Sequence, residues 1–287
     1  MDAPDLADLV DLDMVPLHDP GSPGYRAAVA TARAGLEQEG CAVVRNLVRP
    51  EALEVLSAEI AARKPATHYS TQNINPYFHT EPDPAYPDGH PVNTFIERSS
   101  GFVPGDVWEP GCAMDALFRA PDLARFLADC LGLPDLYCYA DPLAGLTANI
   151  LDPGQQFSWH FDTNEFAVTV LVDAADKGGL FQYAPNIRSA GDEGFAAIGR
   201  VLAGEMAGVR TLDLKPGDVQ IFRGRFSLHR VTRVAAGSRP RHAAIFAYTE
   251  QPGVIGRVTR TRQLFGRVLA EHEAAERARV RGDALID

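Results

Sequence analysis

The sequence predicts a mainly β protein with flanking helices, whose core is a closed or double-sheeted antiparallel fold such as a jelly roll. Two observations carry this prediction. Helical patterns dominate the first 135 residues, and roughly nine short β-prone runs follow between residues 136 and 250, separated by turn sequences such as DPGQ, DKGG and KPGD. We expect a single domain over residues 1–287, with a helical part and lid loops (1–135), a jelly-roll core (136–250) and a C-terminal helix (251–287).

The first half of the chain predicts three helices and one strand. Residues 24–39 are rich in helix formers and stop before a glycine, which favours a helix end. The run CAVVRNLV (41–48) is typical of a short strand. A proline then opens the second predicted helix (50–64), because proline suits the first helical turn. Residues 114–132 resume a helical pattern.

Residues 65–110 interrupt this pattern with many prolines, asparagines, aspartates and aromatic residues. We interpret this stretch as a long loop region. Loops of this length in a compact domain are more often functional than idle, so we expect it to form part of a lid.

The second half of the chain is dominated by predicted strands. One predicted helix (195–204) interrupts them, and the charged, alanine-rich tail (262–282) predicts a solvent-facing helix. The predicted strands are LYCYA, LTANIL, FSWHF, FAVTVLVD, GLFQYA, VRTLDL, DVQIF, SLHRVTRV and HAAIFAYT.

Composition excludes several kinds of partner. The formal charge of −11, with 27 basic and 38 acidic residues, argues against a nucleic-acid partner, whose phosphates require clustered Lys and Arg. No apolar run approaches the roughly 18 residues of a membrane span, and the acidic start is unlike a signal peptide. The four cysteines show no paired spacing, so we expect a cytoplasmic protein with reduced thiols. The sequence does not indicate an oligomeric state.

The stretch FSWHFDTNEF contains two strong metal ligands, His160 and Asp162, one residue apart. In a strand they would share a face, where they could form a simple hydrogen bond or hold a metal. His229, in SLHRV, adds a third ligand, and two His with one carboxylate make the facial triad of non-haem iron(II). The next strand begins near Arg239 and Arg241, and an arginine that points into a barrel needs an anion such as a carboxylate.

These motifs resemble the iron(II)- and 2-oxoglutarate-dependent dioxygenases, which carry WHFD, LHRV and an Arg opening the following strand. The resemblance covers residues 149–248, and GCAVVRNLV is similar to the N-terminal portion of the family. It implies a double-stranded β-helix core, a cupin-like jelly roll. It also implies that His160, Asp162 and His229 hold Fe(II), with 2-oxoglutarate and O2 as cosubstrates.

The same resemblance assigns the 2-oxoglutarate site. Arg241 is expected to pair with the distal carboxylate, with Arg239 as the alternative, although Arg239 precedes Pro240 and fits a turn better. Many members have a serine where this chain has Ala243. Asn149, where some relatives carry a cosubstrate-binding Asn, is the candidate for the missing donor; it could equally bond to a turn.

The resemblance also implies a reaction. Members hydroxylate an unactivated C–H bond and release succinate and CO2. The related radical halogenases replace the carboxylate ligand with Gly or Ala, so the retained Asp162 favours hydroxylation. Desaturation and cyclisation use the same iron chemistry and stay open, as does halogenation if the argument from Asp162 fails.

The runs NPYF, NTFIERSSGF and GGLFQYAPNIR resemble a subgroup that includes free-amino-acid hydroxylases and their halogenating relatives. The expected substrate is therefore a small polar molecule, an amino acid or a natural-product intermediate. Arg98 or Arg188 would bind its carboxylate, and Tyr77, Thr163 and Glu165 are further pocket candidates. Each of these residues could instead make a surface ion pair or a structural hydrogen bond.

Two other classes of protein are alternatives to a dioxygenase. A non-oxidative cupin-like enzyme would show several His on one strand, whereas His160 stands alone in its strand. A metal-free binding module would have lost a ligand or the anchoring arginine. The other histidines predict no second metal set, and alternation should point His242 away from the cofactor. These residues are His18, His68, His79, His90, His242 and His272.

Overall fold

The computed structural model of the chain describes residues 3–278 and 285–286. Its strands are β1 (Cys41–Val44), β2 (His68–Ile74), β3 (Ile96–Val103), β4 (Tyr137–Cys138), β5 (Leu146–Leu151), β6 (Phe157–His160), β7 (Ala167–Asp173), β8 (Phe181–Ala184), β9 (Arg210–Leu212), β10 (Val219–Phe222), β11 (Leu228–Val231), β12 (Arg241–Phe246) and β13 (Tyr248–Thr249).

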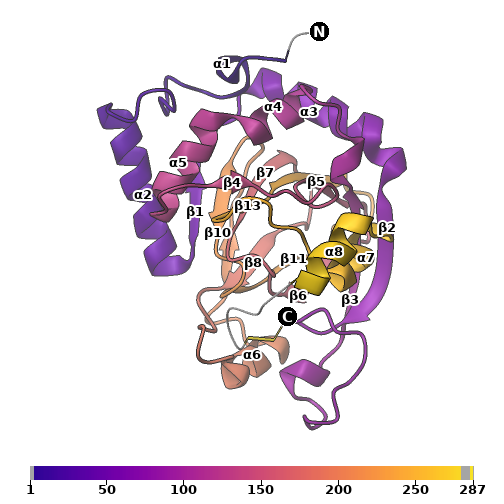
Figure 1. The fold of residues 1–287 in the computed structure, drawn as a ribbon. Coiled ribbons are helices and arrows are strands. Elements are labelled where there is room, and N and C mark those ends of the chain that lie inside the picture. The colour runs from indigo at the N-terminus through magenta and orange to yellow at the C-terminus, as the bar shows by residue number, and fades with distance from the viewer. Residues whose placement is uncertain (1–2, 279–284, 287) are drawn as a thin grey trace.

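The strands form two facing antiparallel sheets. The larger sheet has the order β1-β10-β7-β12-β5-β3-β2, and the smaller sheet has the order β6-β11-β8-β9 (Figure 1). A two-stranded sheet joins β13 to β4. The phenylalanines Phe102, Phe157, Phe181 and Phe222 belong to the core between the two sheets. The predicted double-sheeted β fold is therefore confirmed.

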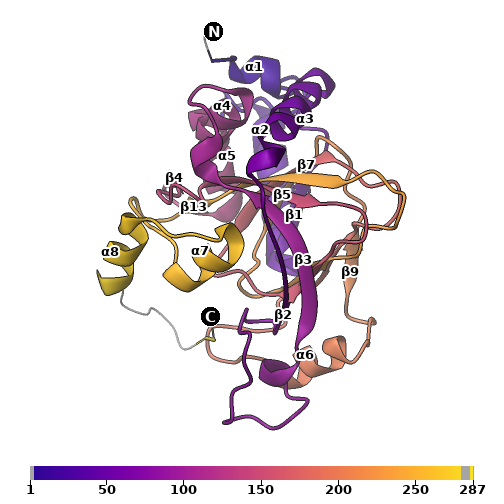
Figure 2. The ribbon, with the colours of Figure 1, turned by 90° about the vertical axis from the view of Figure 1, so that its right-hand side faces the viewer.

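The helices are α1 (Leu6–Leu9), α2 (Pro23–Glu39), α3 (Pro50–Arg63), α4 (Ala113–Arg119), α5 (Pro121–Leu131), α6 (Phe195–Leu202), α7 (Val258–Phe265) and α8 (Ala270–Ala278), with 3₁₀ turns η1 (Lys64–Ala66), η2 (Pro91–Asn93) and η3 (Gly105–Val107). Helices α1 to α5 gather on one side of the larger sheet, whereas α7 lies beside β2 and β3 and α8 lies next to α7 (Figures 1 and 2). None of the described helices is long and apolar enough to cross a membrane.

Strand alternation in the larger sheet separates two cores. On β5, Ala148 and Ile150 join the core under the helices, which also holds Leu56 and Phe126. The intervening residue, Asn149, therefore points to the space between the sheets. This alternation determines which side chains can reach a site inside the barrel.

The predicted helices of the first half are present, with one difference. Ser22 caps α2 by accepting a hydrogen bond from the Tyr25 amide, and α2 ends at Gly40 with φ +64°. The helix predicted over 114–132 is two helices, α4 and α5. Pro121 causes the break, because the residue before a proline is pushed out of helical geometry and the proline then starts a new helix.

The long loop predicted over 65–110 is wrong in part. Strands β2 and β3 pair in register through this region, from His68 opposite Phe102 to Ile74 opposite Ile96. Helix α7 packs across them. The polar residues of β2 concealed the strand, because six of its seven side chains are not buried.

The tail also differs from the prediction of one solvent-facing helix over 262–282. Helices α7 and α8 form two shorter elements, and Gly266 separates them with φ +70°. Thr261 and Phe265 are buried, and His272 is fully buried. Residues 279–282 of the predicted helix lie outside the described part of the chain.

Candidate metal centre

The three predicted ligands meet at one end of the barrel. His160 ends β6, Asp162 follows two residues later, and His229 lies opposite His160 on β11. Oδ1 of Asp162 is 3.9 Å from Nε2 of His160 and 3.5 Å from Nε2 of His229. One ligand atom from each residue lies within 4.8 Å of the others, and no other group of this kind is found among the described residues.

Backbone carbonyls orient both imidazoles. Nδ1 of His160 lies 2.7 Å from the Ser158 carbonyl, and Nδ1 of His229 lies 3.0 Å from the Ser227 carbonyl. A carbonyl only accepts hydrogen bonds, so each Nδ1 carries the proton and each Nε2 keeps a free lone pair. Two imidazole nitrogens and one carboxylate oxygen on one face fit a divalent iron.

The protonation states suit metal binding. Burial, followed by the neighbouring His229, lowers the pKa of His160 well below its ordinary value of 6.5. Burial alone would raise the pKa of Asp162, but His229, His160 and Arg260 outweigh it and lower the pKa to about 2. At neutral pH His160 is therefore neutral and Asp162 is ionised, as metal ligands must be.

A glycine makes room for the carboxylate. A Cβ at Gly224, in the loop between β10 and β11, would lie 1.8 Å from Oδ2 of Asp162 and 2.6 Å from its Cγ. The Gly224 carbonyl also accepts a hydrogen bond from the Asp162 amide at 3.1 Å. The loop is therefore shaped around an aspartate at position 162, and this feature was not predicted from the sequence.

A cavity of ≈ 680 Å³ opens beside His160 and Asp162. One wall is aromatic, formed by Phe78, Phe102 and Phe157. Phe157 stacks on His160 with ring centroids 3.9 Å apart, and Phe78 meets the same ring edge-on at 5.4 Å.

Another part of the lining comes from the C-terminal segment, which sequence reasoning did not connect with the site. It supplies Gly253, Val254, Ile255, Gly256, Arg257, Arg260, Thr261, Leu264, Phe265 and Ala275. Arg260 lies with its guanidinium carbon 3.1 Å from the centroid of the Phe78 ring. The sequence around Arg260 did not predict that this residue lies in the cavity, because arginines on a charged terminal helix are usually solvated.

The two candidate 2-oxoglutarate arginines differ sharply. Arg241 opens β12 and is 5% exposed, and its side chain makes no hydrogen bond or ion pair with any residue that the structure describes. Burial lowers its pKa to about 10. It shares a strand face with Ile245, which lines the cavity. Arg239 is 75% exposed in its side chain and pairs with Asp176 at 2.9 Å.

Asn149 lies on β5 directly opposite Ala243 of β12. Its side chain is buried, and its amide nitrogen donates to the Gly101 carbonyl at 3.2 Å. Its amide oxygen accepts no hydrogen bond from the residues that the structure describes, so the side chain keeps one free polar atom between the sheets.

Arg98 is fully buried on β3. Nε donates to the Ser100 hydroxyl at 3.1 Å, whereas Nη1 and Nη2 have no hydrogen-bond partner among the described residues. Its guanidinium carbon lies 5.3–5.9 Å from the ring centroids of the three cavity phenylalanines, Phe78, Phe102 and Phe157. Burial lowers its pKa to about 10. A cation without a counterion among the described residues therefore lies behind the aromatic wall.

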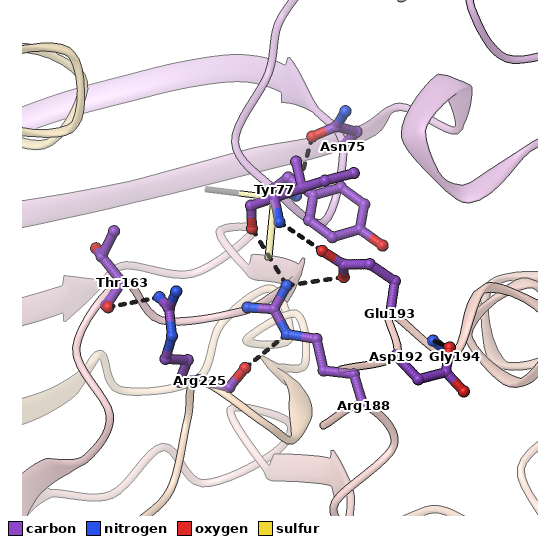
Figure 3. A network of polar contacts seen from close by, with 9 residues as sticks. Asn75, Tyr77, Thr163, Arg188, Asp192, Glu193, Gly194 and Arg225 are labelled. Carbon is purple, nitrogen blue, oxygen red and sulfur yellow. Dashed lines mark hydrogen bonds and ion pairs between the residues drawn. The ribbon is translucent and has the colours of Figure 1, made fainter. Parts of the chain in front are cut away.

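Arg188, the other candidate for a substrate carboxylate, is held by protein groups through Nε and Nη1 (Figure 3). It pairs with Glu193 at 3.0 Å, and it donates to the carbonyls of Arg225 at 2.7 Å and Ile286 at 3.2 Å. Its guanidinium carbon lies 3.9 Å from the Phe161 ring centroid. These contacts leave it a structural role at the edge of the site.

The other three pocket candidates are scattered. Thr163 lines the cavity, and its carbonyl accepts from Arg225 at 2.9 Å. Tyr77 is buried beside Arg188, and its hydroxyl has no hydrogen-bond partner among the described residues. Glu165 lies in a separate small pocket with Glu250, where burial followed by Glu250 raises the pKa of its carboxyl. The structure thus brings only Thr163 of these three to the metal cavity.

Two of the remaining histidines pair with aspartates. His242 points away from the cavity, as predicted, and its Nδ1 lies 2.8 Å from Asp173. The solvent-facing position predicted for His272 is wrong: its side chain is 0% exposed and its Nε2 lies 3.0 Å from Asp141.

Comparison with known proteins gives one family match. The family described as Halogenase D matches residues 102–260, more than half of the chain. No curated protein matches the chain.

Solved structures show the fold. A 2OG-Fe(II) oxygenase family oxidoreductase from Burkholderia pseudomallei is 16% identical with a TM-score of 0.52, covering 78% of this chain and 91% of its own. AviO1 from Streptomyces viridochromogenes Tue57 is also 16% identical with a TM-score of 0.52, covering 82% of this chain and 98% of its own. The predicted resemblance and the predicted fold class are therefore confirmed.

Proposed function

The chain belongs to the Halogenase D family, and from this premise we propose that it is an iron(II)- and 2-oxoglutarate-dependent dioxygenase that hydroxylates a C–H bond of a small polar molecule. The observation that carries the proposal is the His160, Asp162 and His229 set, with both Nε2 lone pairs directed at one point. When bound there, iron with 2-oxoglutarate and O2 would supply the oxidising power, and the products would be the alcohol, succinate and CO2.

Arg241 supports a place for the cosubstrate. A buried guanidinium without a partner is costly, and a carboxylate compensates it best through paired hydrogen bonds. Arg241 has this character and lies on the strand face of a cavity residue, Ile245. We assign Arg241 to the distal carboxylate of 2-oxoglutarate. The side-chain amide of Asn149 lies on the neighbouring strand, and we propose that it also contacts the cosubstrate, through its free oxygen or after rotation of the amide.

Asp162 supports hydroxylation over halogenation, although the family is described as Halogenase D. A halide would need the coordination position that the carboxylate takes. Gly224 leaves space for this carboxylate, so its presence is built into the surrounding loop. The bound substrate carbon should therefore receive oxygen.

The substrate that the cavity favours carries a carboxylate, and a free amino acid fits this description. Arg98 is the arginine that we assign to it, because its two terminal nitrogens have no hydrogen-bond partner in the described part of the chain and its guanidinium lies behind the aromatic wall. Arg188 is less suited, since Glu193 and two carbonyls already occupy its guanidinium.

The test is a panel of free amino acids and small polar carboxylates, incubated with iron(II), 2-oxoglutarate and O2. We expect one compound to stimulate succinate formation and to gain the mass of one oxygen atom. His229→Ala should give neither signal, whereas His18→Ala, which changes an exposed histidine, should behave as the parent. Coupling only to a peptide or a carrier-bound molecule would contradict the small enclosed substrate, and replacement of hydrogen by chlorine would contradict the role of Asp162.

A further inference from the structure

The C-terminal segment Gly253–Ala278, which we name the lid, covers the cavity with residues from both of its helices. Residues 253–257, Arg260, Thr261, Leu264 and Phe265 line the cavity from the chain around α7, and Ala275 does so from α8. Figures 1 and 2 show both helices together beside β3, apart from the α1 to α5 layer. Access to the metal centre past α7 therefore depends on how firmly the lid is held.

One buried carboxylate joins the lid to the barrel. Asp141, in the loop between β4 and β5, has a side chain that is 0% exposed. Its Oδ1 accepts from the amides of Leu143 and Ala144, both at 2.8 Å, which hold the carboxylate in its own loop. Its Oδ2 accepts from the Gly256 amide at 2.9 Å and faces His272 at 3.0 Å, both of which belong to the lid.

The protonation of His272 follows from its contacts. The Leu269 amide donates to Nδ1 of His272 at 3.1 Å, so Nδ1 has no proton. Nε2 therefore carries the proton and donates to Asp141, making a charge-assisted hydrogen bond. Both side chains are 0% exposed, so loss of the donor would leave an ionised carboxylate short of one hydrogen bond in a dry environment.

The chain is also shaped to approach Asp141 closely. A Cβ at Gly256 would lie 2.6 Å from Oδ2 of Asp141, so a side chain there would push the lid off its contact. Gly253, at the start of the lid, has φ +76°. Other contacts also hold the lid: Val254 accepts from Ala140, Gln263 donates to the Phe78 carbonyl, the Phe265 ring packs edge-on against Phe102 with centroids 6.2 Å apart, and Arg267 makes a half-exposed pair with Asp106.

We propose that Gly253–Ala278 is a hinged lid over the metal cavity and that the buried Asp141–His272 pair is its latch. Asp141 and His272 are then positioning residues, which act on the site through Arg260 and the other lid side chains. Water exclusion by this lid in the reaction rests on the proposed function. The latch itself does not, because it is a property of the protein alone.

The lid provides its own reporter, since trypsin cleaves after Arg257, Arg260, Arg262, Arg267 and Arg277. The experiment follows cleavage of the full-length protein at each site by mass spectrometry, under limiting trypsin. In this regime the rate tracks the population of the open lid. Four proteins are compared: the parent, His272→Leu, His272→Gln and His242→Leu.

We expect His272→Leu to accelerate cleavage at the five lid arginines about tenfold or more, the effect of losing one hydrogen bond to a charged group. His272→Gln should return towards the parent rate, because its amide can donate to Asp141. His242→Leu removes a part-buried His–Asp contact on the outer face of β12, and it should leave the lid rate within about twofold of the parent.

Equal acceleration by His272→Leu and His242→Leu would overturn the latch, and so would equal acceleration at sites throughout the chain, which would indicate global unfolding. Failure of His272→Gln to slow cleavage below His272→Leu would also contradict it. None of these results depends on iron, 2-oxoglutarate or substrate. A failed latch is therefore distinguishable from a failed assignment of the reaction.

Discussion

At the residue scale, three buried arginines differ in how their charge is compensated. Arg188 has an acidic partner and two carbonyls, whereas Arg98 and Arg241 have no counterion among the described residues. A buried cation without a partner destabilises a protein, so its presence indicates a ligand that supplies the anion. The sequence predicted the inward arginine of β12, but it gave no means to separate Arg98 from Arg188, because only the contacts distinguish them.

Arg241→Ala is expected to weaken 2-oxoglutarate binding and to leave metal binding unchanged. Removal of the cation leaves the bound carboxylate uncompensated, a loss of about 3–5 kcal/mol. Calorimetry with manganese(II) under anaerobic conditions measures both affinities. Arg239→Ala is the control, because its exposed ion pair with Asp176 is screened by solvent and contributes little. If Arg239→Ala loses the cosubstrate and Arg241→Ala keeps it, the two roles are exchanged.

Arg98→Met is expected to stabilise the ligand-free protein. Burial lowers the pKa of Arg98 from 12.5 to about 10, which corresponds to roughly 3 kcal/mol at about 1.4 kcal/mol per pKa unit. The sign follows from this direction: at neutral pH the group is charged in both states, and the folded state tolerates the charge less well. Replacement by an apolar side chain of similar length should therefore raise the free energy of unfolding. The loss of the cation–π contacts with the phenylalanine rings reduces this gain.

The matched variant for this prediction is Arg188→Met, which should lower the free energy of unfolding by about 3–5 kcal/mol because it leaves Glu193 unpaired. Urea denaturation compares the two. A loss of stability in Arg98→Met as large as that in Arg188→Met would mean that Arg98 has a structural role, and its assignment to a substrate carboxylate would fall.

At the element scale, the hydrophobic periodicity of the sequence predicted the helices and strands that have an apolar face, and it missed those without one. Helices α2 and α3 and most strands of the barrel follow their predicted ranges. Strand β2 was missed because its side chains are mostly polar and its partner β3 supplies the buried face. Helix α7 was predicted as solvent-facing because its charged residues conceal that it packs over β2, β3 and the cavity.

The loop between β10 and β11 gives the element-scale prediction. Gly224→Ala is expected to weaken metal binding at least about tenfold, or ~1.4 kcal/mol, because its Cβ would overlap the Asp162 carboxylate and move it from His229. Metal titration of the purified protein provides the measurement. Gly191→Ala is the control, since a Cβ there meets nothing within 4 Å.

The folded state of Gly224→Ala must be checked by thermal melting, because an overlap in the barrel can also loosen the loop. A folded Gly224→Ala protein with parental metal affinity would show that the Asp162 carboxylate can move away without weakening metal binding. This result would contradict Asp162 as a ligand.

At the scale of the whole molecule, the sequence predicted what is local and repeated, and it missed what depends on distant segments meeting. The His160, Asp162 and His229 set was accessible because strand alternation and two recognisable motifs place each ligand. The lid was not accessible, because it requires the last part of the chain to return to a loop before β5. Likewise, no local sequence pattern links Gly224 to Asp162, although a Cβ at position 224 would overlap the Asp162 carboxylate.

The whole barrel end also makes a prediction about halide. In the parent, Asp162 occupies the third position beside the two histidines, so chloride should leave metal affinity unchanged. Asp162→Gly vacates that position next to Gly224, and the two glycines together leave space for a small anion. Since the metal then lacks a negative ligand, chloride should restore part of the lost affinity, by about tenfold at saturation.

Asp162→Asn is the matched control, because it removes the charge and keeps the volume, so that chloride finds no space. Cobalt(II) titrations with chloride or a larger, weakly coordinating anion at equal ionic strength provide the measurement. If chloride strengthens binding equally in the parent, the carboxylate does not block the halide position, and the argument for hydroxylation within this family loses its physical basis.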